Sequence, residues 1–529
     1  MCTCLIAGRK ASGTGKAILA ANDDWEGCPG LLTHVPGAAH REGEMYTLTG
    51  GQRIPQVKET CGYVYTACKY TIGTLNRAWA GGMNDRGVAV AGTGVDAYKP
   101  LSWKPGDGNT YQPHNQPHNQ QQNQQQNLSQ DWVQEGWLLE PDDIPLLVLQ
   151  RGTSARQAVR LIGDLINSYG LRPSYIEGAA GSSAATFSIA DKKEGWILEV
   201  YPGRCWIAMR VPDDCVSVRV NAFGTHDADL TDQENTMSSP GLAAYARERG
   251  LWDGDERHFD FASAFGSETS PTEWGPEKDP MNLRRRWRAM YLIDGREEPE
   301  EVLRYLARPA ETCLAPDLKE KKYRSEKAGC VGTEDMMHIL SDIYEGTLYD
   351  LTKVAEAGPM HDPFADGMPY YAICRQYTVA SFVTDYVGEQ EEPLMWTAMG
   401  IPKLVPYIPI WVDIDGLPEY CHVVDIGEMK EKGQCPGSEE MSERHQSLYE
   451  IMNAYSTQVR EQYDRNVSDA EERKKSYQER MSSLIQAEAG NTQEAGNTQE
   501  AGDLHIRGKR TRQTEAHIKT AIAACRTQI

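Results

Sequence analysis

The first 25 residues alternate short apolar runs with a polar turn. Leu5–Ala7 and Ile18–Ala20 flank a turn rich in Gly, Ser and Lys at residues 10–16. Short apolar runs around such a turn are typical of a β-hairpin. We therefore predict that the second strand brings residues 22–24 back beside Cys2, at the very start of the first strand.

The rest of the chain mixes both periodicities. Residues 143–169 carry apolar side chains at helical spacing and are followed by Gly170, a common helix stop. Further strand-like runs lie at Gly62–Tyr65, Gly87–Gly92, Thr186–Ile189, Trp196–Val200, Trp206–Val211, Val216–Val220, Tyr370–Tyr386, Leu394–Met399 and Val405–Val412. This mixture predicts an α+β fold.

Composition shifts divide the chain. A Gln/Asn-rich tract at about 107–130 has nothing to bury, and we predict a disordered surface insertion there. The pattern becomes helical and highly charged beyond about residue 430, and the hexapeptide E-A-G-N-T-Q occurs twice within 488–499. We predict a main domain at 2–430, a charged helical extension at 431–486, and a flexible repeat linker and tail at 487–529, in which a helix at 503–529 is left open.

Charge and cysteine content narrow the functional classes. The net charge of −22 argues against nucleic-acid and anionic-membrane partners, which require basic surfaces. The chain has 13 cysteines without a repeating spacing, which favours a reducing compartment over a disulfide framework. We find no apolar run of membrane-spanning length and no signal peptide. The sequence predicts a soluble, cytoplasmic protein, and it leaves a homo-oligomer open.

Cys2 is the main candidate for chemistry. It follows Met1 and is small, so methionine removal is expected to expose it. One residue then carries a thiol nucleophile and a free α-amine. That amine titrates near pH 7.7–8.0 when unperturbed, so it can serve as the base that activates the thiol. The alternative is an ordinary small buried cysteine.

The opening C-T-C-L-I-A-G and the returning A-A-N-D-D at 20–24 resemble the N-terminal-nucleophile cysteine dipeptidases, the dipeptidase A and secernin family. Bile salt hydrolases and penicillin V acylases are more distant relatives with a similar opening. Other stretches that resemble the family are G-G-M-N-D-R-G-V-A-V-A-G (81–92), D-D-I-P-L-L-V-L-Q-R-G-T-S-A-R-Q-A-V (142–159), W-I-L-E-V-Y-P-G-R-C-W-I-A-M-R-V-P-D-D-C (196–215), Y-E-G-T-L-Y-D (344–350) and Y-T-V-A-S-F-V-T-D (377–385).

The resemblance implies a four-layer αββα sandwich of two antiparallel sheets between helices. It also implies a cysteine dipeptidase that hydrolyses small dipeptide substrates through a thioester, without a metal or an organic cofactor. An acylase-type amidohydrolase acting on another amide is one alternative. A secernin-like protein with the same fold and a non-peptidase role is the second.

Two further catalytic residues are implied by the resemblance. Asp24 stands where the wider superfamily has its catalytic Asp, and its carboxylate would orient the Cys2 ammonium. Asn221 stands where related enzymes have an oxyanion-hole Asn. Each has a structural alternative: a turn Asp that caps backbone N–H groups, and a strand-end Asn that satisfies a turn.

The positions of two other side chains are less well defined. Arg285 best matches an Arg that the family carries two residues before Trp, where it would hold the catalytic Asp or the substrate carboxylate. Arg284 and Arg286 leave this assignment ambiguous by one residue. Asn84, in a predicted hairpin, is a candidate for substrate binding, with a purely structural role as the alternative.

The chain departs from the family at position 21. The family has Arg immediately before the N-D-D motif, and this chain has Ala21. In relatives that Arg lies near the thiolate and would lower its pKa. Its absence implies weaker activation of Cys2, compensation by another cation, or a different role.

Overall fold

The computed structural model describes residues 2–26, 29–72, 75–95, 137–172, 184–266, 281–294, 313–314, 331–421, 447–490 and 499–526. The Gln/Asn tract at 107–130 lies outside the described residues, as does much of the duplicated hexapeptide.

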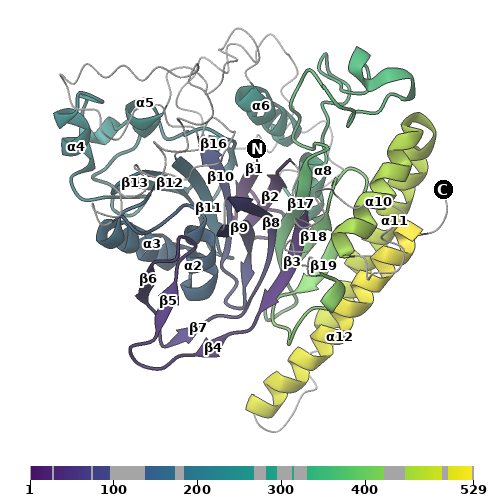
Figure 1. Ribbon diagram of the computed structural model, residues 1–529, viewed down its shortest axis with the longest axis horizontal. Helices are drawn as coiled ribbons and strands as arrows, with labels where there is room; N and C mark the ends of the chain where they lie inside the picture. The colour runs from purple at the N-terminus through teal and green to yellow at the C-terminus, as the bar shows by residue number, and fades with distance from the viewer. Residues whose placement is uncertain are drawn as a thin grey trace.

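Two antiparallel sheets form the centre of the molecule (Figure 1). Sheet I contains, in spatial order, β16 (Cys313–Leu314), β14 (Val216–Arg219), β1 (Thr3–Ala7), β2 (Ile18–Asp24), β17 (Thr378–Val387), β18 (Glu392–Met399) and β19 (Ile408–Trp411). Sheet II contains β15 (Thr236–Ser238), β13 (Cys205–Val211), β12 (Gly195–Tyr201), β11 (Ala184–Ala190), β10 (Ala89–Val95), β9 (Leu75–Asn84), β8 (Tyr63–Ile72) and β3 (Gly30–Val35). The small pairs β4 (Ala38–Ala39) with β7 (Glu59–Thr60) and β5 (Met45–Thr47) with β6 (Arg53–Pro55) lie apart from them.

The predicted N-terminal hairpin is confirmed. Strands β1 and β2 pair with Thr3 opposite Asn22 and Ala7 opposite Ile18. On its other side β1 pairs with β14, so the first strand of the chain lies inside sheet I and is buried along its whole length. The start of the chain is therefore held between two neighbouring strands.

The two sheets pack face to face. Strands β1 and β2 of sheet I contact β10 and β11 of sheet II. Gly195 shows how close the sheets approach, because a Cβ atom at this position would overlap the side chain of Ile6. The inner face of β1 is thus covered by sheet II.

Helices cover both outer faces. Helices α2 (Asp143–Arg151) and α3 (Ala155–Tyr169) lie on sheet II, and α6 (Met281–Asp294), α8 (Thr333–Leu340), α10 (Leu448–Glu461), α11 (Tyr463–Gly490) and α12 (Gln499–Arg526) lie on the side of sheet I (Figure 1). The α+β class and the αββα layering are confirmed. Short helices complete the fold: α4 (Leu242–Glu248), α5 (Phe261–Phe265), η1 (Glu256–His258), η2 (Ala355–Met360) and η3 (Glu419–Cys421).

The helix predicted at 143–169 is interrupted. Gly152 ends α2 with an extended ψ of 124°, and Ser154 begins α3 by accepting a hydrogen bond from the N–H of Gln157. A serine N-cap satisfies one of the free N–H groups of a new helix. The apolar spacing continued across this break, so it did not indicate the interruption.

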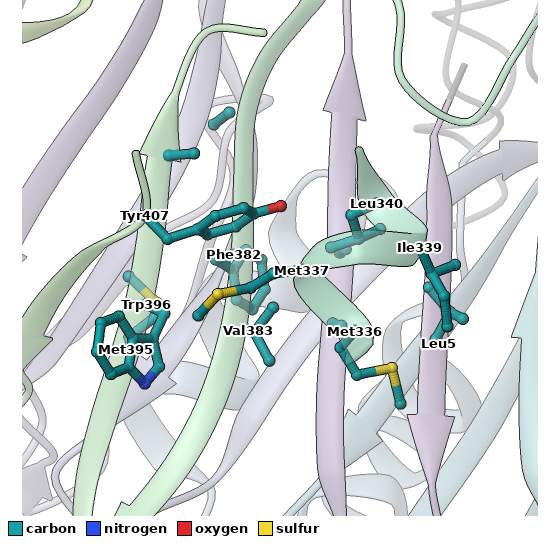
Figure 2. Packing of buried hydrophobic residues seen from close by; sticks show 14 of the residues in the cluster. Leu5, Met336, Met337, Ile339, Leu340, Phe382, Val383, Met395, Trp396 and Tyr407 are labelled. Carbon is teal, nitrogen blue, oxygen red and sulfur yellow. The ribbon is translucent and has the colours of Figure 1, made fainter. Parts of the chain in front are cut away.

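Apolar packing joins the helix layer to sheet I. Figure 2 shows α8 over β2 and β17, with Met337 directed toward Val383. Both side chains belong to one large buried cluster that also contains Leu5 of β1. Burying an aliphatic side chain of this size contributes about 1.5–3 kcal/mol, so this packing fixes the strand on which the nucleophile candidate lies.

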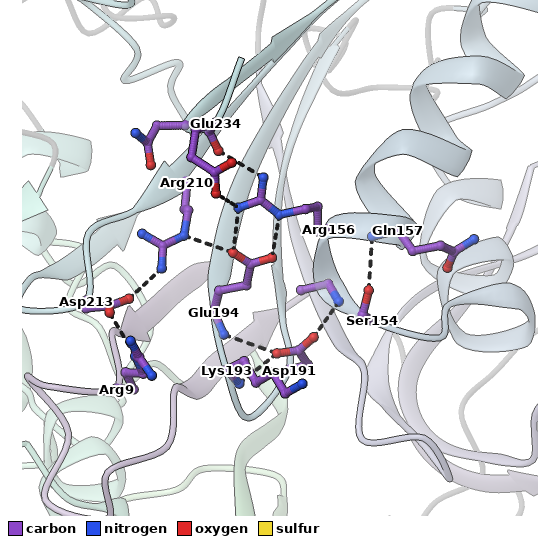
Figure 3. Close-up of polar contacts among 12 residues, drawn as sticks. Arg9, Ser154, Arg156, Gln157, Asp191, Lys193, Glu194, Arg210, Asp213 and Glu234 are labelled. Carbon is purple, nitrogen blue, oxygen red and sulfur yellow. Dashed lines mark hydrogen bonds and ion pairs between the residues drawn. The ribbon is translucent and has the colours of Figure 1, made fainter. Parts of the chain in front are cut away.

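An ion-pair network joins the turn between β11 and β12 of sheet II to α3 (Figure 3). Glu194 accepts hydrogen bonds from Arg156 and Arg210, each at 2.9 Å. Arg210 also pairs with Asp213, which receives a second bond from Arg9 at 2.8 Å. Asp213 therefore anchors the turn after β1 to the turn after β13.

The C-terminal residues differ in part from the prediction of a flexible repeat linker and tail at 487–529. Helix α11 continues to Gly490, and α12 extends over Gln499–Arg526, which includes the tail for which the sequence left a helix open. Helix α12 contacts β19, α10 and α11. Its buried side chains, such as Ile518, belong to the same cluster as β1, so these residues are part of the outer helical layer.

Candidate active site

The thiol of Cys2 lies against a carboxylate on the neighbouring strand. Continuing the pairing of Thr3 with Asn22 by one residue places Cys2 opposite Asp23. The Cys2 thiol donates a hydrogen bond to Oδ1 of Asp23 at 3.5 Å. Directly opposed residues of an antiparallel pair project from the same face, so both side chains lie on the face of sheet I that meets sheet II.

Arg285 of α6 holds the backbone of Cys2. Its side chain is fully buried, and Nη1 donates to the carbonyl oxygen of Cys2 at 2.8 Å and to Oγ1 of Thr3 at 3.1 Å. Nη2 donates to Oδ1 of Asn221 at 2.9 Å and to Oδ1 of Asn282 at 2.7 Å. The planar fork of the guanidinium thus fixes two chain segments at once.

The structure resolves which of the three consecutive arginines belongs to the site. Arg285 makes the contacts with Cys2, whereas the Arg284 guanidinium lies over the rings of Tyr349 and Tyr370, at 4.4 and 4.5 Å from their centroids. The helix therefore presents Arg285 to the strands and Arg284 to the aromatic rings.

Asn221 adjoins Cys2, as the sequence predicted. It follows β14 closely, and its Oδ1 accepts a hydrogen bond from the backbone nitrogen of Cys2 at 3.1 Å. Its Nδ2 donates to the carbonyl oxygen of Gly94 at 2.9 Å. A carboxamide nitrogen carries two hydrogens, so one N–H remains available for a developing oxyanion. The oxyanion role itself stays a prediction.

Asp24 follows Asp23 on β2, but its side chain projects from the opposite face of sheet I. Its Oδ1 accepts a hydrogen bond of 2.6 Å from Oγ1 of Thr378, on the adjacent strand β17. Burial raises the pKa of Asp24, while the positive amino terminus and the charges of Arg375 and Arg285 act to lower it. Its catalytic role stays a prediction, exerted through charge and through Thr378 rather than by side-chain contact with the thiol.

The sequence predicts the catalytic carboxylate at Asp24 and not at Asp23. The signal that could have found it is the hairpin register: in an antiparallel pair, the residue one before Thr3 faces the residue one after Asn22. The family comparison directed attention to Asp24 instead. A second missed residue is Cys68 of β8, whose thiol lies 3.9 Å from the same Oδ1 of Asp23.

Desolvation dominates the electrostatics. Burial raises the pKa of the Cys2 thiol to about 12, the positive amino terminus acts to lower it, and the charges of Asp23 and Asp24 raise it further. Burial also raises the pKa of Asp23 to about 7, against the lowering effect of the amino terminus. Thiolate formation in this site therefore requires a nearby positive charge or a base.

The hydrogen bonds of the Asn84 side chain are made with residues other than Cys2. It ends β9, and its Nδ2 donates to the carbonyl oxygens of Leu149 and Gly152. Its Oδ1 accepts from the N–H groups of Arg86 and Val88. The side chain is fully buried and bonded only to backbone, which supports the structural alternative rather than substrate binding.

The described residues lack a cluster of three or more His, Cys, Asp or Glu side chains that could hold a metal ion. The cysteines whose side chains the structure describes, Cys2, Cys4, Cys61, Cys68, Cys205, Cys215, Cys374, Cys421 and Cys525, are free thiols. Among the described helices, none has both the length and the apolar character required to cross a bilayer.

Comparison with known proteins gives related peptidases. The Latilactobacillus sakei protein named "Probable dipeptidase" is 24% identical over 438 residues, which cover 79% of this chain and 75% of that protein. The "Probable dipeptidase" of Salmonella dublin is 29% identical over 274 residues, covering 50% of this chain and about half (53%) of its own length.

Among solved structures, a mutant of the conjugated bile acid hydrolase from Clostridium perfringens aligns with a TM-score of 0.33 at 10% identity, covering 75% of this chain and 89% of that one. The model of peptidase family C69 matches residues 1–476. Because this match extends over most of the 529 residues, the chain belongs to peptidase family C69.

Proposed function

We propose that the protein is a cysteine dipeptidase whose nucleophile is Cys2, made N-terminal by removal of Met1. The observation that carries the proposal is the way in which the first strand is held. The Cys2 backbone is bonded to both Asn221 and Arg285, and its thiol contacts a carboxylate. The names of the related dipeptidases support the substrate class.

The proposed reaction proceeds in two displacements. The α-amine of Cys2 takes the thiol proton, and the thiolate attacks the scissile carbonyl carbon, so that an S–C bond forms. The free N–H of Asn221 donates to the oxyanion. The C–N bond then breaks, and the departing amine takes the proton from the Cys2 ammonium. Water, activated by the same amine, hydrolyses the thioester and restores the thiol.

Arg285 acts in this scheme as a positioning residue. Its bonds to the Cys2 carbonyl oxygen and to Oδ1 of Asn221 hold the nucleophile and the oxyanion donor in one geometry. The Cys2 nitrogen also donates to Oδ1 of Asn221. The proposed base is therefore bonded directly to the side chain that carries the proposed oxyanion donor.

The direct test combines intact mass with dipeptide hydrolysis. The purified protein is expected to begin at Cys2, and Cys2→Ala is expected to abolish hydrolysis while the melting temperature stays close to that of the wild type. Cys2→Ser should keep only trace activity, because an alcohol is a far weaker nucleophile at neutral pH. Asn221→Ala should lower kcat by about 10²–10³-fold, the usual effect of removing one oxyanion donor.

Two results would contradict the proposal. One is full activity in material whose mass shows complete retention of Met1, because Cys2 would then lack a free amine. The other is full activity of Cys2→Ala. Hydrolysis of N-acyl amides but not of dipeptides would point instead to the acylase-type alternative, and no hydrolysis of either class to the non-peptidase alternative.

A further inference from the structure

Asp23 is unusual among the charged groups of the site because, among the described residues, no Arg or Lys side chain is paired with its carboxylate, and the positive amino terminus is the cation that acts on its pKa. Its hydrogen bonds there come from the thiols of Cys2 and Cys68. Its neighbour Asp24, by contrast, is influenced by the charges of Arg375 and Arg285 and bonded to Thr378. Asp23 is also partly exposed, whereas Asp24 is buried.

Position 21 explains part of this difference. Residues two apart on a strand project from the same face, so Ala21 and Asp23 share the face that carries Cys2. A long cationic side chain at position 21 would lie on the side of Asp23, and alanine cannot supply that charge. After processing, the α-nitrogen of Cys2 is the other local cation, and its bond to Asn221 uses one of its N–H groups.

Building on the proposed function, we propose that Asp23 binds the α-ammonium group of the dipeptide substrate and so selects peptides with a free N-terminus. This role is distinct from the chemistry assigned to Cys2 and Asn221, because it concerns the part of the substrate that does not react.

Covalent geometry supports the placement. In a peptide the α-nitrogen lies about 2.5 Å from the carbonyl carbon of the same residue, and attacking atoms approach that carbon to about 3–3.5 Å. A substrate ammonium therefore lies roughly 3–5 Å from the Cys2 sulfur when the carbonyl is in position. Oδ1 of Asp23 lies 3.5 Å from the same sulfur. The charged N–H···O bond of about 2.8 Å closes this triangle without movement of the backbone.

The ammonium group of the substrate would also balance the negative charge of the Asp23 carboxylate. Burial raises the pKa of Asp23 to about 7, although the positive amino terminus acts to lower it. A bound ammonium favours the ionised form of a neighbouring carboxylate. The ion pair is formed in a water-poor site, where it contributes more than at a surface.

The test compares two substrates that differ only in the ammonium group: L-alanyl-L-alanine and propionyl-L-alanine. The wild type should prefer the dipeptide in kcat/KM, and Asp23→Asn should reduce that preference by about 10–100-fold, the effect of one charged hydrogen bond. Asp24→Asn is the matched control: it removes the adjacent carboxylate from the opposite face and should slow both substrates by the same factor.

A binding measurement keeps the test independent of turnover. Calorimetry on Cys2→Ala should show tighter binding of L-alanyl-L-alanine than of propionyl-L-alanine, and the Cys2→Ala, Asp23→Asn double variant should lose the difference. Equal slowing of both substrates by Asp23→Asn overturns the inference, as does a wild type without preference. Hydrolysis of neither substrate, with no binding difference, removes both the inference and the proposed function.

Discussion

Two adjacent carboxylates, Asp23 and Asp24, show how strand alternation separates residues that are neighbours in sequence. One faces the thiol of Cys2 and the other faces Thr378. The same alternation puts Ala21 on the face of Asp23. Small changes at these three positions should therefore have different and separable effects.

The ionised carboxylate of Asp23 should lower the free energy of unfolding at high pH. Its pKa is raised from an ordinary value of 3.8 to about 7 in the folded protein, so the folded state binds more protons than the unfolded state between these values. The free energy of unfolding consequently falls as pH rises from about 4 to 7. Asp23→Asn should be more stable than the wild type at pH 8, and the difference should shrink toward pH 4.5, as measured by urea denaturation.

Asp213→Asn serves as the control with the opposite sign. Its bonds to Arg9 and Arg210 outweigh its desolvation and keep the pKa of Asp213 below its ordinary value, so its contribution is present at neutral pH and is lost as pH falls. The Asp23 prediction fails if the stability difference between Asp23→Asn and the wild type is the same at pH 4.5 and pH 8.

Position 21 should set the reactivity of the nucleophile. Ala21→Arg places a cation on the Cys2 face, and an opposite charge nearby lowers a thiol pKa, typically by about 1–3 units for close pairs. Iodoacetamide should then alkylate Cys2 with a pH profile shifted downward, whereas Ala21→Met, of similar length but neutral, should leave the profile unchanged. Identical profiles for Ala21→Arg and wild type would show that position 21 does not govern thiolate formation.

At the residue scale, part of the candidate active site could be predicted from the sequence. Motif resemblance pointed to Cys2, Asn221 and Arg285, and all three meet in the structure. It did not identify Asp23, because the residue that faces Cys2 depends on the hairpin register. It also could not show that backbone groups of the β9–β10 turn and of the end of α2 would occupy the side chain of Asn84.

At the element scale, the edge of sheet I depends on the last helix. β19 is the final strand of that sheet, and α12 packs along it. The backbone N–H of Trp411 donates to Oγ1 of Thr514 at 3.3 Å, and the carbonyl oxygen of Pro409 bonds the ring of His517. Helix α12 thereby satisfies polar groups that an open strand edge would leave unpaired.

Truncation after Gly490 should therefore destabilise the protein and promote association. Loss of buried side chains such as Ile518 should lower the free energy of unfolding by at least about 3 kcal/mol, and the exposed β19 edge should form oligomers detectable by light scattering. Ile518→Val, a milder change, should cost only about 0.5–1.5 kcal/mol and leave the mass unchanged. A truncated protein of wild-type stability would show that α12 is dispensable.

The sequence anticipated strands better than this helix. Short apolar runs between turns indicated most of sheets I and II, because each strand shows its own local period. The residues of α12 were assigned to a linker and a tail because the duplicated, polar hexapeptide precedes them, with a helix in the tail left open. Their burial depends on β19 and α10, which are distant in sequence.

At the scale of the whole molecule, one buried cluster links the N-terminal strands to the C-terminal helices. It contains Leu5 of β1, Trp411 of β19, Met481 of α11 and Ile518 of α12. The layers on the side of sheet I therefore share their stabilising contacts and should open together.

Hydrogen exchange tests this expectation. Backbone amides of β2 and of the buried side of α11 should show similar free energies of opening. The short helices α4 and α5, which pack in a separate cluster, should exchange sooner. Early exchange of α10–α12 as a unit of their own would show that the helical layer is an independent domain.

The position of β1 also imposes an order on biosynthesis. Asn221, which bonds the Cys2 nitrogen, is translated 219 residues later, and Thr378, which bonds Asp24, follows that carboxylate by 354 residues. At about 5–20 residues per second, the ribosome takes roughly 10–45 s to reach Asn221 and roughly 20–70 s to reach Thr378. During this interval the amino terminus has no completed sheet around it. We therefore expect the proposed removal of Met1 to take place on the nascent chain within that time, because the finished fold buries Cys2.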